Sequence, residues 1–288
     1  MLIISILLNG LVLGSTLMLF SLGLTLIYGV GRIVNFAHGA LFSAGAFIGM
    51  VMAKSGQPFW VCLVAAPLIL AMIGMLLDWV VLARIRDRPM LDGLLLTFGL
   101  ALAVTGVLYA NGGRIVQIFP IPPQLTGSTS IGPVGVPTYR LFLAVFAALL
   151  MVALLICLAK TKWGLRVRAA NDQPEMAACL GINRETLMHS VVGAGTALAG
   201  IAGVAAAPIL TVHATTGDKL LILGFLTVIL GGLGSFRGAI VAAYVVGLIL
   251  IAGEVYVGGQ LAMILLLVMV MVMLIKWPRG FFNEGRVE

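Results

Sequence analysis

Apolar runs of about 20 residues recur along almost the whole chain, and this pattern constrains its fold more than any other feature. Hydrophobic residues make up 61% of the 288 residues and charged residues 9%, whereas a soluble domain carries about 25% charged residues. Because the bilayer core holds no water, each run must satisfy its backbone hydrogen bonds internally, as a helix does. We therefore expect an all-α, polytopic integral membrane protein in contact with a lipid bilayer.

The apolar runs predict eight or nine transmembrane helices, some of them broken or re-entrant. Their ranges are 2–29, 31–53, 60–82, 94–110, 141–159, 189–212, 220–257 and 260–275. Two of these ranges, 31–53 and 220–257, are compatible with either full crossings or half-helices, because glycines and polar residues interrupt them. The first run lacks a basic start and exceeds the about 7–15 apolar residues of a signal peptide, so we expect it to be retained as a span.

The basic residues predict the orientation of the chain. With nine crossings and an outside N-terminus, 13 of the 17 lysines and arginines face one side. These are Arg32, Arg84, Arg86, Arg88, Lys160, Lys162, Arg166, Arg168, Arg184, Arg237, Lys276, Arg279 and Arg286. Since loops rich in Lys and Arg stay in the cytoplasm, we expect the polar segment 160–188 and the C-terminus inside, and the proline-rich loop 111–139 outside.

Several function classes find no support in the sequence. The net charge of +7 is not gathered on a polar domain, so we expect no nucleic-acid partner. No phosphate-binding G-x-x-x-x-G-K-[ST] motif is present, and the glycine-rich string GGLGSFRGA at 231–239 lacks its lysine. His38, His189 and His213 are far apart and have no ligand-like spacing to a cysteine or carboxylate, so we expect no metal site. We accordingly expect neither an enzyme nor a bound cofactor.

The polar segment KTKWGLRVRAANDQPEMAACLGINRE, residues 160–185, is the longest interruption of the apolar pattern. Asn171 and Asp172 are good helix starters, Pro174 suits a first helical turn, and Glu175 complements the helix dipole. Gly181 can adopt the left-handed conformation that ends a helix. We expect a short helix over 172–181 at the membrane surface. Such a helix can lie among lipid headgroups, dock into a soluble partner or serve as a solvated connector.

A few polar residues stand within or beside the apolar runs. Glu254 lies in LILIAGEVYVGG, where a charge is costly and a functional role is the first hypothesis; the alternative is a position at the outer interface. Asn35 and His38 either line a cavity or meet interfacial water at a helix boundary. Asp78, near the end of its run, is expected to pair with Arg84 or a neighbouring arginine.

Three strings in order resemble one known family. GLTLIYGVGRIVNFAHGALFSAGAF at 23–47, GLRVRAANDQPEMAACLGIN at 164–183 and LGGLGSFRGAIVAA at 230–243 are similar to the membrane permeases of bacterial ABC importers for branched-chain amino acids. Within that family the chain looks like the first of the two paired inner-membrane permeases. The resemblance covers nearly the whole chain and implies a single permease transmembrane domain over 1–288.

The resemblance also implies partners and site residues. In that family a paired homologous permease completes the path, two cytoplasmic ABC ATPases bind ATP-Mg, and a periplasmic protein delivers the substrate. The segment 160–188 would be the loop that couples the permease to the ATPase. The positions implied for coupling are Gly164, Ala169, Ala170, Asn171, Asp172, Glu175 and Gly181.

Substrate and pathway stay open at this stage. Relatives of this permease type also carry urea, short amides or aromatic acids, and the two permeases can be different or identical chains. A hypothesis from another class is a stand-alone, ion-coupled secondary carrier that uses Glu254 and His38. The residues we expect along the translocation path are Asn35, His38, Gly231, Gly232 and Glu254.

Overall fold

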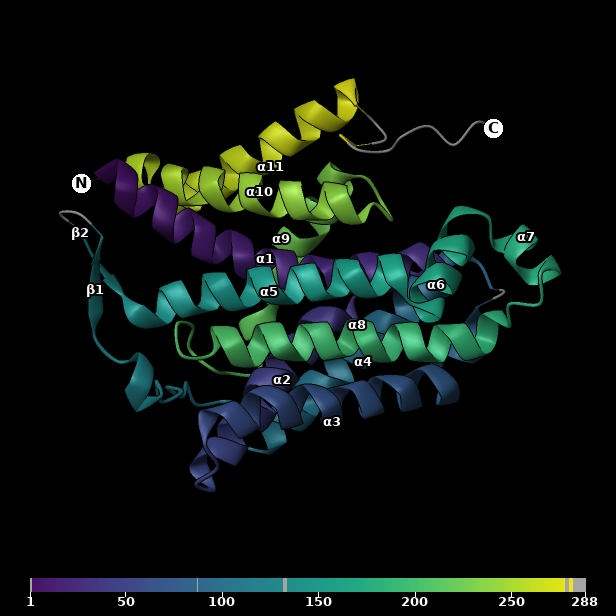
Figure 1. The fold of residues 1–288 in the computed structure, drawn as a ribbon, viewed down its shortest axis with the longest axis horizontal. Helices are drawn as coiled ribbons and strands as arrows, with labels where there is room; N and C mark the ends of the chain where they lie inside the picture. The colour runs from purple at the N-terminus through teal and green to yellow at the C-terminus, as the bar shows by residue number, and fades with distance from the viewer. Residues whose placement is uncertain (1, 87, 132–133, 278–279, 282–288) are drawn as a thin grey trace.

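The computed structural model describes residues 2–86, 88–131, 134–277 and 280–281. It is an elongated bundle in which most helices follow the long axis (Figure 1). A small β-hairpin and the N-terminus lie at one end, here called the hairpin end, and the short helices α6 and α7 lie at the other, the α7 end. Arg279 and Arg286, counted above for orientation, lie outside the described residues.

The elements follow the apolar pattern of the sequence closely. The longer helices are α1 (Leu2–Gly31), α2 (Ala37–Lys54), α3 (Phe59–Val80), α4 (Met90–Ala110), α5 (Thr138–Lys160), α8 (Arg184–Ala206), α9 (Thr216–Gly231), α10 (Phe236–Val257) and α11 (Gly259–Lys276). The short elements are η1 (Leu82–Ile85), η2 (Pro123–Leu125), β1 (Ser128–Ile131), β2 (Val134–Pro137), α6 (Lys162–Asp172) and α7 (Pro174–Cys179).

Eight helices in the described ranges are long and apolar enough to cross a membrane, which confirms the predicted all-α, polytopic fold. The exception among the longer helices is α9, which has 16 residues, fewer than the about 17–25 of a transmembrane helix. The open question about 31–53 and 220–257 is thereby answered by length: α2 and α10 qualify as spans and α9 does not.

Small residues allow the central helices to pack closely. α1 lies along α10 and α8, and α8 also lies along α2 and α3. At the crossing of α1 and α10, a side chain at Gly247 would meet the backbone of Gly10 and Gly14 at 2.6–2.8 Å. Glycines spaced four apart let two backbones approach in this way. The core is therefore built around α1 and α8, while α4, α5 and α11 expose most of their apolar surface.

The helical structure is interrupted at residues 32–36, between α1 and α2. Arg32 adopts a left-handed backbone with a φ of 56°, which ends α1. The Asn35 side chain then accepts a hydrogen bond of 3.1 Å from the Ala37 amide at the start of α2. Thr97 of α4, fully buried, accepts from the Phe36 amide and donates to the Val34 carbonyl, each at 3.2 Å. Neighbouring helices thus satisfy the backbone groups that the break releases.

The proline-rich segment 111–139 contains more regular structure than its composition indicates. Within it, β1 and β2 pair antiparallel, with Ser128 opposite Pro137. Gln117 forms an isolated bridge with Val212, which joins this segment to the connection between α8 and α9. Both are two-stranded edge pairings, and proline is tolerated at such edges.

The short helix α9 begins inside the bundle. Ser43 of α2 accepts a hydrogen bond of 2.8 Å from the Gly217 amide in the first turn of α9. A side chain at Gly217 would overlap the backbone carbonyl of Gly39, also on α2. The connection 207–215 therefore enters the bundle from the hairpin end before α9 starts, which is the re-entrant geometry expected of a broken span.

Candidate functional site

The predicted coupling segment forms two helices instead of one. α6 starts at Thr161, whose hydroxyl accepts a hydrogen bond of 3.0 Å from the Gly164 amide. Gly164 is buried against the end of α5, and a side chain there would overlap the backbone of Leu158. Our expectation that Asn171 and Asp172 start a helix is wrong: they end α6. The stretch before them begins behind a threonine cap and contains good helix formers such as Leu165, Arg166 and Ala169.

α7 is short and projects from the bundle at the end opposite the hairpin (Figure 1). Gln173 has a non-helical backbone, with φ −140° and ψ 83°, and a second helix, α7, begins at Pro174. Gly181 follows with a φ of 81°, as expected for the residue that turns the chain after a helix. Glu175, Met176 and Leu180 are exposed, so α7 presents both a charge and apolar side chains to its surroundings.

Asn171 ties the coupling segment to the bundle. Its backbone carbonyl accepts a hydrogen bond of 3.0 Å from the Arg32 guanidinium. A Cβ atom added at Gly29 or at Gly234 would lie 2.7 or 3.1 Å, respectively, from the Asn171 side-chain oxygen. Gly29 is in the last turn of α1, and Gly234 lies between α9 and α10. The end of α6 therefore contacts the break after α1 and the turn before α10 at once.

The other residues of the predicted coupling set have different surroundings. Ala170 is 5% exposed in a cluster with Val167 and the ends of α1 and α8. Ala169 packs at the margin of that cluster, and Asp172 is exposed. The structure thus divides the set into residues that pack on the bundle and exposed residues from the end of α6 onward. The first group is Gly164, Ala169, Ala170 and Asn171, and the second is Asp172, Glu175 and Gly181.

A buried charge cluster at the α7 end was only partly predicted. Asp78 of α3 is fully buried and accepts from Arg86, a neighbouring arginine as expected, and from His189 of α8 at 2.6 Å. The histidine was not predicted, because 111 residues separate it from Asp78. This cluster joins the loop between α3 and α4 to the first turns of α8, directly after the coupling segment.

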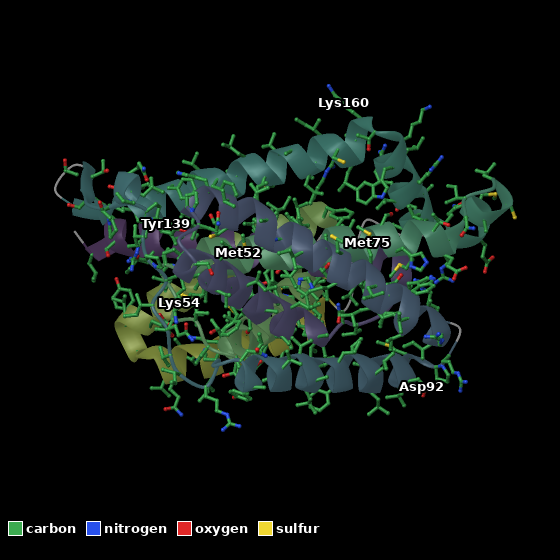
Figure 2. All side chains as sticks on the ribbon, turned by 90° about the horizontal axis from the view of Figure 1, so that it is seen from below. Met52, Lys54, Met75, Asp92, Tyr139 and Lys160 are labelled. Atoms are coloured by element: carbon green, nitrogen blue, oxygen red, sulfur yellow. The ribbon has the colours of Figure 1, made fainter. Side chains whose placement is uncertain are left out.

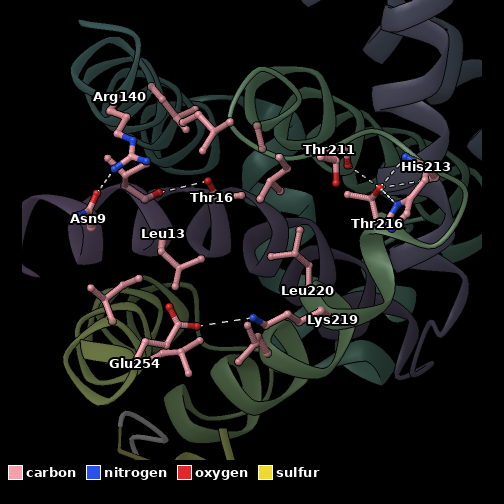
Figure 3. Close-up of a pocket in the computed structure, with 18 of the residues that line it drawn as sticks. Asn9, Leu13, Thr16, Arg140, Thr211, His213, Thr216, Lys219, Leu220 and Glu254 are labelled. Carbon is pink, nitrogen blue, oxygen red and sulfur yellow. Dashed lines mark hydrogen bonds and ion pairs between the residues drawn. The ribbon is translucent and has the colours of Figure 1, made fainter. Parts of the chain in front are cut away.

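The cavity at the hairpin end has a volume of about 680 Å³, and its walls come from α1, α5, the end of α8, the connection 207–215, α9 and α10 (Figure 3). We call it the hairpin-end cavity. Its polar lining residues are Asn9, Thr16, Arg140, Thr211, His213, Thr215, Thr216, Lys219 and Glu254. The apolar residues are Val12, Leu13, Leu143, Ala206, Ile209, Leu210, Leu220, Leu223, Leu250, Ile251 and Val255.

The charged groups of this cavity are held in two pairs. Lys219 Nζ lies 3.7 Å from Glu254 Oε1, with 65% and 34% of the respective side chains exposed. Arg140 donates to the amide oxygen of Asn9. Thr216 is held by the His213 amide, whose nitrogen lies 2.8 Å from its hydroxyl. Glu254 thus has a basic partner at a helix end, 35 residues away in sequence, and is not isolated in the bilayer.

The structure does not bring the other predicted path residues to this cavity. His38 is fully buried, and its Nε2 lies 3.1 Å from the Phe20 carbonyl. Asn35 lines a separate, largely apolar hollow of about 200 Å³ beside Phe225 and Tyr28. Gly231 packs directly on the backbone of Gly238, and Gly232 turns the chain after α9 with a φ of 96°. These residues therefore do not line the hairpin-end cavity, and Asn35, Gly231 and Gly232 stand at helix ends.

Comparison with known proteins identifies the family of this chain. The sequence model described as "Branched-chain amino acid transport system / permease component" matches residues 6–275. The chain belongs to this family. It is therefore a multi-pass membrane permease, as the three strings in the sequence indicated.

Individual relatives agree over nearly the whole permease. The high-affinity branched-chain amino acid transport system permease protein LivH of Salmonella typhimurium is 26% identical over 294 residues, covering 97% of this chain and 95% of its own. BraD of Pseudomonas aeruginosa, which carries the same description, is 24% identical over 295 residues, covering 98% and 96%. A probable LivH of Methanocaldococcus jannaschii is 28% identical over 259 residues, covering 83% and 78%. No solved structure matches the chain.

Proposed function

We propose that this permease forms half of the translocation path of a binding-protein-dependent ABC importer for branched-chain amino acids. The observation that carries the proposal is the match to the permease family over residues 6–275. A homologous permease would complete the path, and a periplasmic protein would deliver the substrate. The complex would sit in the bacterial inner membrane.

The distribution of charge supports an orientation with the α7 end in the cytoplasm. The connections at that end carry Arg32, the arginines of 84–88 and the basic residues of α6. The hairpin end carries Lys54, Arg114, Arg140 and Lys219, and Figure 2 shows Lys54 at the opposite end of the bundle from Asp92, which closely follows the arginines of 84–88. Since lysine and arginine accumulate on the cytoplasmic side, the hairpin end and the hairpin-end cavity face the periplasm in this orientation.

We assign α7 the role of docking on a cytoplasmic ATPase. Its exposed surface surrounds a hollow of about 440 Å³ lined by Gln173, Pro174, Glu175, Met176 and Cys179. Exposed apolar residues rimmed by polar ones are typical of a protein-binding surface. The partner ATPases would bind ATP-Mg and hydrolyse ATP, and this chain would transmit the movement without catalysis.

Contacts of α6 supply a path for that movement into the bundle. A force on α7 reaches α6 and then Asn171, which touches both the break after α1 and the turn before α10. The turn contains Gly232 and follows α9, whose other end lines the hairpin-end cavity. The coupling segment and the cavity are thus linked through one short helix.

The secondary-carrier alternative receives less support. It requires Glu254 and His38 to act together, but Glu254 faces the hairpin-end cavity while His38 packs on Phe20 and is not among the residues that line it. Glu254 also has Lys219 beside it, which lowers the cost of its charge without any proton transfer. ATP hydrolysis by a separate ATPase is the simpler energy source for transport.

Reconstitution of the complex tests the proposal. The permease, its paired permease, the ATPases and the binding protein are placed in liposomes, and uptake of leucine, urea and a short amide is measured with and without ATP. The proposal predicts ATP-dependent leucine uptake, and no uptake by this chain alone under an ion gradient. Uptake by the chain alone, or uptake of urea in preference to leucine, contradicts it.

A further inference from the structure

We infer that the hairpin-end cavity is a binding site for a zwitterionic amino acid with an aliphatic side chain. The inference rests on the proposed function and names the site at which this permease receives its substrate. At about 680 Å³ the cavity falls within the about 300–1,000 Å³ typical of small-molecule sites. It therefore has room for one small substrate together with water.

The basic residues of the cavity favour a ligand that carries a carboxylate. Arg140 and Lys219 both line it, while Glu254 is the one carboxylate in its lining. Among the described residues Arg140 makes no ion pair with an acidic side chain, and its guanidinium contacts the neutral amide of Asn9. Because a guanidinium can bind a carboxylate through two parallel hydrogen bonds, Arg140 is suited to the α-carboxylate of an amino acid.

Glu254 supplies the complementary group for the α-ammonium. Its separation of 3.7 Å from Lys219 exceeds the about 2.7–2.9 Å of a charge-assisted hydrogen bond. The Lys219 side chain is 65% exposed and can rotate away. An incoming ammonium can therefore bind Glu254 without breaking a tight ion pair.

Apolar residues lie between these charges and below them. Figure 3 shows Leu13 between Arg140 and the Lys219–Glu254 pair, with Leu220 on the neighbouring helix. Leu220 and Leu223 of α9 are 5% and 1% exposed, which leaves an apolar floor. A branched aliphatic side chain placed on this floor leaves its carboxyl group free to face Arg140 and its amino group free to face Glu254.

The same lining disfavours the other substrates considered from the sequence. Urea and short amides are uncharged and would leave Arg140 without an ionic partner, while Lys219 and Glu254 would keep only each other. An aromatic acid would satisfy Arg140 but bring no ammonium to Glu254. A zwitterion satisfies both residues, and a site built for charged groups rejects ligands that lack them.

Two substitutions and a matched control test this inference in the complete complex. Glu254→Gln and Arg140→Gln each remove one charge, and Arg114→Gln removes an exposed basic residue at the same end that does not line the cavity. We expect leucine uptake to fall about tenfold or more in each cavity variant, the size expected when a charge-assisted hydrogen bond is lost. Uptake by the control is expected to stay at the wild-type rate.

Competition for labelled leucine, measured on the solubilised complex without the binding protein, separates site loss from misfolding. Leucinamide keeps the ammonium and 4-methylpentanoate keeps the carboxylate. Glu254→Gln is expected to weaken leucinamide more than 4-methylpentanoate, and Arg140→Gln to do the reverse. Equal weakening of both competitors in both variants, or leucine uptake at the wild-type rate in both, overturns the inference. If the wild-type complex takes up no leucine with ATP, the proposed function itself fails.

Discussion

The guanidinium of Arg32 donates a hydrogen bond of 3.0 Å to the backbone carbonyl of Asn171, across 139 residues of sequence. The acceptor lies in the last turn of α6, where the helix dipole concentrates negative charge. Arg32 itself stands at the break between α1 and α2, with a φ of 56°. One contact therefore fixes the coupling segment to the point at which the first membrane helix ends.

Replacing this arginine should weaken coupling. Arg32→Gly keeps the left-handed backbone, which glycine adopts readily, and removes the guanidinium. A hydrogen bond to a charged group contributes about 1.5–3 kcal/mol, so we expect uptake to fall about tenfold while ATP hydrolysis continues. Arg168→Ala on the exposed side of α6 is the control and should retain uptake. A proportional loss of hydrolysis and uptake would contradict the assigned role.

The buried cluster around Asp78 should dominate the stability of the α7 end. Asp78→Ala leaves the Arg86 charge without its carboxylate, and removal of one partner of a buried pair costs about 3–5 kcal/mol. Asp92→Ala, at a half-buried position in the first turn of α4, should cost less than about 1 kcal/mol, because Asp92 makes no ion pair with another described residue. Thermal unfolding of the detergent-solubilised permease measures both. Equal stability of the two variants would show that the cluster is not structural.

Two helical glycines, one tightly packed and one with open space around it, give a second stability test. A side chain at Gly231 would overlap the backbone of Gly238, whereas one at Gly106 meets nothing within 4 Å. Gly231→Ala should destabilise the permease by about 1–3 kcal/mol through overpacking. Gly106→Ala should be neutral or stabilising, because alanine favours a helix over glycine by about 1 kcal/mol. An unchanged stability of Gly231→Ala would mean that Gly231 and Gly238 can separate at no cost.

The native cysteines can report the orientation. Cys179 on α7 is exposed, Cys62 is buried and Cys157 is partly buried near the end of α5. In a Cys157→Ala background, a membrane-impermeant maleimide should label the permease in inverted vesicles and leave it unlabelled in right-side-out vesicles. Cys179→Ala should remove the signal. Labelling from the outside would place α7 in the periplasm and reverse the assigned topology.

The sequence predicts the membrane helices well because each depends on local composition. Hydropathy gives the range of α3 to within two residues of the observed Phe59–Val80, and likewise the range of α11. It predicts the coupling segment less well, because the helical character of 162–172 depends on a threonine cap and on a close approach at Gly164. Local pattern alone gave one helix where the chain forms two.

The parts that escaped prediction are contacts between distant residues. Nothing in the sequence joins Lys219 to Glu254, or His189 to Asp78, because these pairs are created by helix packing. The lining residues of the hairpin-end cavity come from four separate stretches of the chain, 9–16, 140–143, 206–223 and 250–255, so its charges could not be grouped beforehand. Glu254 was identified as a candidate because a carboxylate beside an apolar run is unusual, but its position beside Lys219 in the hairpin-end cavity needed the structure.

The central claim is that a separate ATPase drives this permease through α7. Glu175 is exposed on that helix, so Glu175→Lys reverses its charge without disturbing the bundle. The decisive measurement is ATP-dependent leucine uptake by liposomes that contain the complete complex with this variant at wild-type amounts. The account predicts that uptake falls to the level without ATP, and uptake at the wild-type rate would contradict it.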